Sequence, residues 1–448
     1  MRRRADLALE SAAREFGEQR DDFLDRAVLV YQGRSDNSDP LSELRQLAES
    51  AGVEVVAEII SRRESPNPAT FIGSGKVEQI KDEVALSEAS LVVINHAITP
   101  LQERNLERTL ECRVLDRTRL ILDIFAQRAA THEGKLQVEL AQLRYLSTRL
   151  VRGWSHLERQ KGGIGLRGPG ETQLETDRRL IGKRISTLIR RLERIRRQRE
   201  LRRRSRRKVP VPTISLVGYT NAGKSTLFNR LTEANAFVAD QVFATLDPTM
   251  RRIDIEGFGE AIISDTVGFI RDLPHGLVSA FHATLEEVSH ADLLIHVVDA
   301  TDPDRGEMMA AVNQVLDEID ANQIPTIMVY NKIDLGERDS DIEQGREGRI
   351  QKVWLSAVSG EGIPLLLQGI ADHLGSDRRH FRLRLPVSAS RLRASLYRRG
   401  SVVTEAFTDE GDSLLELNLD SGDIGWLEQQ EELNSGSTLE SIAATTQG

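Results

Sequence analysis

Cysteine is nearly absent from this sequence: Cys112 is the only one among 448 residues. A single cysteine excludes an intrachain disulfide and fits a reducing compartment, and we expect Cys112 to be a small apolar filler. No apolar run approaches the roughly 20 residues of a membrane span. The basic first residues lead into no apolar stretch of a secretory signal, and no histidines and cysteines share a zinc spacing. We therefore expect a cytoplasmic protein without stable membrane insertion, and peripheral membrane association stays open.

Basic residues are missing from the end of the chain and crowded in its middle. After Arg399 there is no Lys or Arg, whereas about half of residues 178–208 are Lys or Arg. So dense a basic segment in a chain of net charge −9 favours a polyanionic partner over a merely solvated surface. Aromatic residues make up only 4% of the chain, with Tyr145 and Trp154 alone nearby, which favours recognition of backbone and shape over base stacking. Structured RNA is the expected target, and DNA is not expected.

Strand and helix patterns divide the chain into four parts and predict a multidomain α/β fold. The parts are a small N-terminal β/α domain (1–130), a helical arm (131–208), a P-loop domain (209–374) and a small α+β C-terminal domain with an acidic tail (375–448). We expect the tail beyond residue 420 to be mostly flexible, with Trp426 and Leu427 docking locally.

The arm has leucines and isoleucines at helical spacing in two long runs, about 135–159 and 171–207. The apolar residues form a seam between the two helices, but they do not explain the arginines of the second helix. An antiparallel two-helix coiled arm with a glycine-rich loop at 162–170 is the simplest structure for this pattern.

A phosphate-binding loop stands between an apolar strand pattern at 213–217 and a helical pattern at 226–231. It matches G-x-x-x-x-G-K-[ST], and the strand–loop–helix context is what this pattern requires. Its backbone N–H groups and the helix N-terminus bind phosphate, Lys224 reaches the β- and γ-phosphates, and the Ser225 hydroxyl ligates Mg²⁺. The expected nucleotide contacts here are Gly218, Tyr219, Thr220, Asn221, Ala222, Gly223, Lys224 and Ser225.

Two further segments belong to the phosphate side of the site. A D-x-x-G sequence follows a strand pattern, so that Asp265 can hold Mg²⁺ through water and the Gly268 N–H can meet a γ-phosphate. Between it and the phosphate loop, Thr245 and Thr249 can each place a hydroxyl on Mg²⁺; we expect Thr245 to do so. Lys224, Thr245 and Gly268 are the expected catalytic residues, with Ser225 and Thr245 as metal ligands. The nucleotide contacts predicted from these segments are Phe243, Ala244, Thr245, Leu246, Asp247, Asp265, Thr266, Val267 and Gly268.

The segments expected beside the nucleotide base predict that this base is guanine. The sequence N-K-I-D follows an apolar strand pattern at 325–330, and the Asp334 carboxylate can accept hydrogen bonds from the guanine N1–H and N2–H₂ groups. Adenine presents no such pair of donors, so this contact selects against ATP. The stem of Lys332 can pack over the base, and backbone N–H groups of a later loop can meet the guanine O6. The residues predicted on the base side are Asn331, Lys332, Ile333, Asp334, Ser356, Ala357 and Val358.

Together these motifs resemble the translation-factor-like P-loop GTPases and, within them, the HflX family of the Obg–HflX branch. The resemblance lies in GYTNAGKST, FATLDPT, DTVGFI, NKID and the glycine-rich sequence upstream. It implies hydrolysis of GTP to GDP and binding to the RNA of the large ribosomal subunit, with splitting of stalled or idle ribosomes. It also implies that Asn221 helps to ligate K⁺; the alternative, that Asn221 only stabilises the loop turn, stays open.

One residue bears on the rate of hydrolysis. Phe269 stands where Ras-like enzymes carry the glutamine that orients the attacking water. A phenyl ring cannot hydrogen-bond water in that way. We therefore expect slow turnover by the protein alone and stimulation by a partner.

Two alternatives for the function remain. The sequence F-I-G-S-G-K at residues 71–76 resembles half a phosphate loop, so an RNA-remodelling NTPase could use ATP through the N-terminal domain. A GTP switch for a protein effector is the second alternative, although it would not need the basic segment. We expect GTP, GDP and the large ribosomal subunit as binding partners, and a monomer.

Overall fold

The structure is a computed structural model. It describes residues 25–33, 39–62, 65–152, 169–206, 211–232, 243, 249–256, 258–271, 282–336, 338–345, 348–375, 379–398, 401–408, 411–419, 424, 426–427, 430 and 438–441. No helix among these residues is long and apolar enough to cross a membrane.

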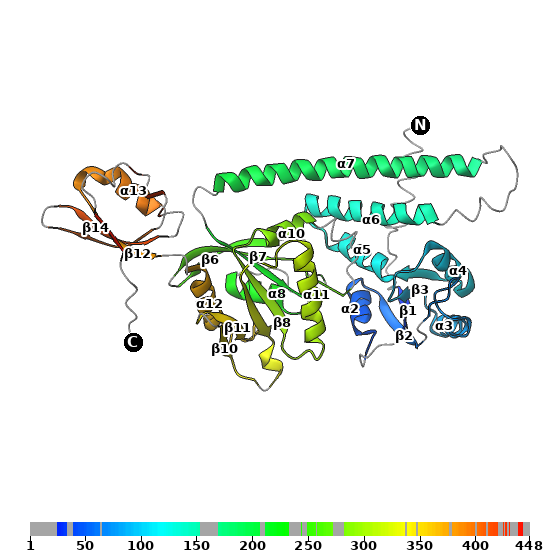
Figure 1. The fold of residues 1–448 in the computed structure, drawn as a ribbon. Coiled ribbons are helices and arrows are strands. Elements are labelled where there is room, and N and C mark those ends of the chain that lie inside the picture. Colours follow the sequence, from blue (N-terminus) through cyan, green and yellow to red (C-terminus); the bar gives the residue numbers. More distant parts are fainter. Residues whose placement is uncertain are drawn as a thin grey trace.

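The N-terminal domain is a four-stranded parallel sheet of order β2-β1-β3-β4 with helices around it (Figure 1). Local chemistry sets its helix ends: Thr99 and Gln102 form a capping box at the start of one helix, with Pro100 in the first turn. Cys112 packs partly buried against the core beneath the sheet, as predicted. The elements are β1 (Arg26–Gln32), α2 (Ser42–Ser50), β2 (Glu54–Ser61), α3 (Ser74–Ser87), β3 (Leu91–Ile94), α4 (Pro100–Leu110), β4 (Arg113–Asp116) and α5 (Arg117–Arg128).

The arm is a pair of helices, α6 (His132–Arg152) and α7 (Pro169–Arg206), that lie side by side across the N-terminal and P-loop domains (Figure 1). Their seam is apolar, with Leu140, Leu143 and Leu188 buried in it. Arg184 and Glu139 close the seam with an ion pair of 2.6 Å between Nε and Oε1. The predicted two-helix arm is confirmed, and the glycine-rich loop at 162–170 lies almost wholly outside the described residues.

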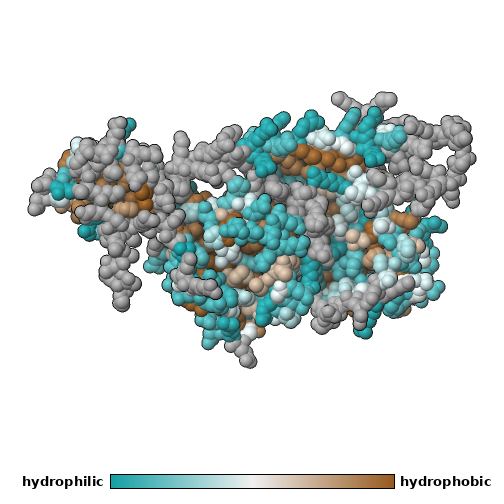
Figure 2. All heavy atoms as spheres, viewed as in Figure 1, coloured by the Kyte–Doolittle hydropathy of each residue, from teal (hydrophilic) through white to brown (hydrophobic). Residues whose placement is uncertain are grey.

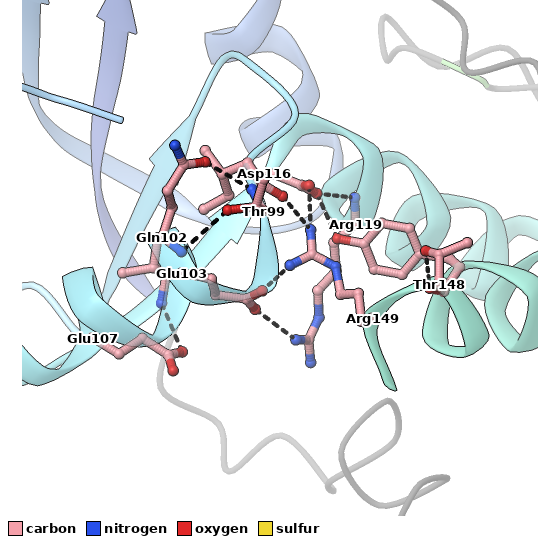
Figure 3. A network of polar contacts seen from close by, with 11 residues as sticks. Thr99, Gln102, Glu103, Glu107, Asp116, Arg119, Thr148 and Arg149 are labelled. Carbon is pink, nitrogen blue, oxygen red and sulfur yellow. Dashed lines mark hydrogen bonds and ion pairs between the residues drawn. The ribbon is translucent and has the colours of Figure 1, made fainter. Parts of the chain in front are cut away.

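A polar network fixes α6 to the N-terminal domain (Figure 3). The Asp116 carboxylate caps α5 by accepting the Arg119 N–H at 2.8 Å, and it also accepts the Tyr145 hydroxyl at 2.8 Å. Arg149, near the end of α6, donates to Asp116 at 2.5 Å and pairs with Glu103 of α4. Because these side chains are almost wholly buried and mutually paired, the network sets the direction of the arm.

The P-loop domain is a seven-stranded sheet of order β10-β11-β9-β8-β5-β7-β6, in which the edge strands β6 and β10 run antiparallel to their neighbours and the other pairs are parallel. Its apolar strands are buried beneath helices on both faces, as parallel strands usually are. The elements are β5 (Thr213–Gly218), α8 (Lys224–Thr232), β6 (Thr249–Ile255), β7 (Gly259–Asp265), α10 (His282–Ser289), β8 (Leu293–Asp299), α11 (Arg305–Glu318), β9 (Thr326–Asn331), η1 (Ile333–Leu335), β10 (Asp341–Gln344), β11 (Ile350–Trp354) and α12 (Ile363–Gly375).

The C-terminal domain contains an antiparallel sheet of order β13-β14-β12-β15 and the helix α13. Its elements are β12 (Arg379–Leu385), η2 (Val387–Ala389), α13 (Ser390–Arg398), β13 (Val402–Phe407), β14 (Ser413–Leu419) and β15 (Thr438–Ser441). The prediction of a mostly flexible tail is wrong for β15, because this short strand gains backbone hydrogen bonds by pairing with β12. Leu427 is fully buried against the sheet and Trp426 packs beside it, which confirms the predicted local docking.

One apolar core joins the N-terminal and P-loop domains. It contains Phe125 from α5 together with Phe243, Phe269 and Ile270 from the segments around the phosphate loop. The rings of Phe125 and Phe243 meet edge to face, with centroids 4.5 Å apart. The two domains are therefore packed together beside the predicted nucleotide site.

Candidate functional site

The phosphate loop runs from the end of β5 into α8 and has a backbone that few residue types adopt. Asn221 has φ 60° and Gly223 has φ +91°. A Cβ on Gly223 would lie 2.2 Å from the Asn331 side-chain nitrogen. Glycine is needed at this position because a side chain would collide with a buried group that itself holds the loop.

Asn331 ties the phosphate loop to the base-side loop. It is 3% exposed at the end of β9. Its side chain donates to the Ala222 carbonyl at 2.9 Å and accepts from the Ala357 N–H at 2.9 Å. Because each contact satisfies a buried backbone group, Asn331 fixes the distance between the two loops.

The predicted metal side is assembled around Asp265 at the end of β7. The Ser225 hydroxyl donates to the Asp265 carboxylate at 2.7 Å, so a hydroxyl and a carboxylate oxygen, both suited to Mg²⁺, lie together. Thr249 begins β6 and lies opposite Asp265 in the antiparallel register. Thr245 falls outside the described residues, as do Ala244, Leu246 and Asp247.

Lys224 is buried at the start of α8, with its ammonium group donating to the Tyr219 carbonyl at 2.7 Å. Burial lowers the pKa of Lys224 to about 8, although the charge of Asp265 acts in the opposite direction. Burial, together with the Lys224 charge, lowers the pKa of His296 to about 4. His296 is therefore neutral at physiological pH and leaves Lys224 as the positive charge beneath the loop.

The D-x-x-G segment lies directly on the phosphate loop. Phe269 donates its N–H to the Gly218 carbonyl at 3.1 Å, and its carbonyl accepts the Thr220 N–H at 2.8 Å. The Phe269 ring is 1% exposed and points into the interdomain core. The residue at the usual glutamine position thus serves packing, in line with the prediction that it cannot orient water.

The base side presents the predicted carboxylate. Asp334 lies exposed in η1, next to Lys332, whose φ of 69° begins that turn. The Lys332 ammonium group pairs with Asp299 at 2.8 Å. Burial alone would raise the pKa of Asp299, but hydrogen bonds from Lys332 and Thr301 outweigh it and hold this pKa below its ordinary value. Val358 is 71% exposed in the loop after β11.

Three family models match successive parts of the chain. They are described as GTP-binding GTPase N-terminal (residues 38–126), GTP-binding GTPase Middle Region (128–206) and 50S ribosome-binding GTPase (213–332). The chain is 55% identical over 410 residues to GTPase HflX of Escherichia coli (strain K12). These residues are 91% of this chain and 96% of that protein. The chain belongs to the HflX family of GTPases. It is accordingly an enzyme that hydrolyses GTP.

A second relative agrees with this HflX assignment. GTPase HflX of Magnetococcus marinus is 50% identical over 364 residues, which are 81% of this chain and 84% of that protein. A solved structure of a GTP-binding protein from the hyperthermophilic archaeon Sulfolobus solfataricus in complex with GDP is 26% identical, with a TM-score of 0.43 over 78% of this chain and 99% of its own.

In this HflX-family chain, the structure brings together the described members of the predicted site from the ends of β5, β7 and β9 and from the loop after β11. It also places residues there that the sequence did not single out. Asp299 pairs with Lys332, and His296 is close enough to Lys224 for that charge to act on it. From the N-terminal domain, Glu43 contacts Tyr219 of the phosphate loop, and Arg117 contacts Glu43 and the Arg271 carbonyl beside it. No local pattern marks Glu43 or Arg117, because their role depends on how two distant segments pack.

Proposed function

We propose that this GTPase binds the large ribosomal subunit in its GTP state through the arm, and that hydrolysis releases it, so that stalled or idle ribosomes are split or rescued. The observation that supports this most is the outer face of α7, which is hydrophilic (Figure 2) and on which exposed basic residues far outnumber acidic ones. The exposed cations there are Arg178, Arg179, Lys183, Arg190, Arg191, Arg194, Arg196 and Arg197. A rigid helix with this array fits the phosphates of structured RNA.

At the nucleotide, we assign Lys224 to the β- and γ-phosphates and the Gly268 N–H to the γ-phosphate. Mg²⁺ would be held by Ser225 and Thr245, with Asp265 acting through water, and it would neutralise charge on the β- and γ-oxygens. The 2.7 Å contact between Ser225 and Asp265 supports this set of ligands. Thr245 keeps its assignment from the sequence alone.

For the base, we assign Asp334 to the guanine N1–H and N2–H₂ groups, Lys332 to the face of the ring and the Ala357 loop to O6. The Asn331 bridge between the phosphate loop and the Ala357 loop supports this arrangement. It fixes the two ends of the nucleotide site at one separation.

Nucleotide affinity should depend on the charge of Lys224. Phosphate oxygens favour the ammonium form, so binding takes up a proton wherever the free lysine has lost one. With a pKa of about 8, we expect the affinity for GDP to be level below that pH and to fall above it, by at most about tenfold per pH unit. Fluorescence titration from pH 6.5 to 9.5 measures this.

Lys224→Arg is the reference for that titration, since a guanidinium keeps its charge throughout this range. Loss of the guanine N1 proton at high pH affects both proteins alike. Parallel pH profiles for the two proteins would contradict the assignment of Lys224.

Turnover tests the proposal as a whole. We expect slow GTP hydrolysis by the protein alone and a strong rise with purified large subunits. A further rise in potassium over sodium would support Asn221 as a K⁺ ligand. If subunits have no effect, the protein-effector switch becomes the better account, and ATP hydrolysis at a comparable rate would favour the N-terminal NTPase alternative.

The proposal places the protein in the cytoplasm as a monomer. Cell fractionation tests whether it also associates with the membrane surface.

Charge reversal on α7 tests the RNA contact directly. We expect Arg190→Glu with Arg191→Glu to weaken binding to large subunits by about tenfold or more and to lower the slope of log affinity against log salt by roughly 1 per lost phosphate contact. Arg104→Glu with Arg108→Glu, also exposed arginines on a helix, is the matched control. Pelleting through sucrose at several salt concentrations measures both, and wild-type binding by the α7 variant would remove the arm from the interface.

A further inference from the structure

Tyr219, the second residue of the phosphate loop, reaches away from the loop toward the N-terminal domain. Its side chain is buried. The hydroxyl accepts a hydrogen bond from the Arg271 backbone N–H at 2.7 Å and donates one to the Glu43 carboxylate. Burial raises the pKa of Tyr219, with the Glu43 charge acting in the same direction, so the hydroxyl keeps the proton that it donates.

Arg117 of α5 also contacts the backbone of Arg271. Its guanidinium donates to the Arg271 carbonyl at 3.0 Å and pairs with Glu43 at 2.8 Å. A further bond of 2.9 Å to Asn95 orients it. Both backbone polar groups of Arg271 are therefore held by side chains, one from the phosphate loop and one from the N-terminal domain.

Arg271 lies three residues after Gly268, and the chain between them is pinned to the phosphate loop through Phe269. Gly268 is pressed close against that loop. A carbon built as its Cβ would lie 3.0 Å from the Lys224 ammonium nitrogen and 2.8 Å from Thr220 Cγ2. The Lys224 tip can turn aside, but Thr220 Cα, also 3.0 Å from that point, belongs to the loop backbone. A phosphoryl group is larger than that carbon, so its entry beside Gly268 is expected to move this segment outward. GDP ends at its β-phosphate, so its binding does not require this movement.

We propose that Tyr219 is a positioning residue that sets the preference of this protein for GDP over GTP. Together with Glu43 and Arg117 it forms a clamp on Arg271, which holds Gly268 against the phosphate loop. Binding of the γ-phosphate loosens the clamp, whereas binding of GDP leaves it closed. The inference rests on the assignment of Lys224 and Gly268 to the γ-phosphate made above.

Tyr219→Phe is the direct test because it keeps the ring and removes only the hydroxyl. The dissociation constants of a fluorescent GDP and of a fluorescent, slowly hydrolysed GTP analogue are measured with Mg²⁺ on the full-length protein. We expect the dissociation constant of the GTP analogue to fall relative to that of GDP by about threefold to tenfold, the range for one net hydrogen bond. An unchanged ratio, or an equal loss of affinity for both nucleotides as in a merely structural role, overturns the proposal.

Glu43→Gln provides a second route should Tyr219→Phe fold poorly, and the double variant tests the connection. Tyr219 bonds the Arg271 N–H directly, and Glu43 acts on Arg271 through Tyr219 and Arg117. The change of the ratio in the double variant should therefore be smaller than the sum of the two single changes. Tyr397→Phe is the matched control: its hydroxyl donates to Glu405 at 2.6 Å in the C-terminal domain, and its loss should leave the ratio unchanged.

Lys224→Ala, run in parallel, separates the two levels of the proposal. Weakened binding of the GTP analogue to Lys224→Ala with an unchanged ratio in Tyr219→Phe overturns the clamp alone. Undiminished binding to Lys224→Ala overturns the assignment of the phosphate site, and the clamp proposal with it.

Discussion

Replacing Asp334 by asparagine is expected to lower the affinity for guanine nucleotides by at least about a hundredfold. The carboxylate can accept from both the N1–H and N2–H₂ groups of guanine, whereas an amide offers one acceptor and one donor. The variant would leave a guanine donor facing an N–H group, and a site built on such hydrogen bonds rejects a mismatched partner steeply. Asp334 is held in place by η1 and by the buried Asn331 before it, so the exchange should alter recognition without disturbing the fold.

Titration with fluorescent GDP and with xanthosine diphosphate measures this change. Xanthine carries a carbonyl where guanine carries the amino group, so the asparagine N–H₂ gains an acceptor and we expect tighter binding of the xanthine nucleotide. Asp339→Asn, an exposed carboxylate close by in the chain, is the control. Affinity for GDP within about twofold of wild type would place the guanine contact on another residue.

Replacing Phe125 by alanine is expected to lower the free energy of unfolding by about 3–5 kcal/mol. Phe125 is 1% exposed and meets Phe243 edge to face in the core shared by two domains. Truncation removes a large apolar side chain and leaves a cavity that the packed strands and helices around it cannot fill. The loss should appear in the unfolding transition that involves both domains.

Urea unfolding followed by far-UV circular dichroism measures this effect. Phe125→Leu keeps most of the buried volume and should cost much less. Phe407→Ala removes a ring that is 65% exposed and should change stability by no more than about 0.5 kcal/mol. A loss below about 1 kcal/mol for Phe125→Ala would mean that the interdomain core does not hold the domains together.

Much of the fold was predictable because its signals are local. The β/α alternation of the first domain, the leucine spacing of α6 and α7, and the strand–loop–helix around Lys224 each depend on residues within one or two elements. Predicted boundaries differ from the observed ones by a few residues, as for the helical pattern at 226–231 and the helix found at Lys224–Thr232. The paired strand β15 was missed because its partner β12 lies more than 50 residues earlier in the chain.

By itself the sequence predicted the nucleotide site: the order of Gly223, Lys224, Asp265 and Asp334 along alternating strands and helices brings them to one edge of a parallel sheet. Only the tertiary structure decided what lies against that site. The Tyr219–Glu43 contact joins residues 176 positions apart, and Phe269 finds its place in a core built from two domains. Contacts of this kind depend on the packing of whole domains, and no spacing or periodicity along the chain encodes them.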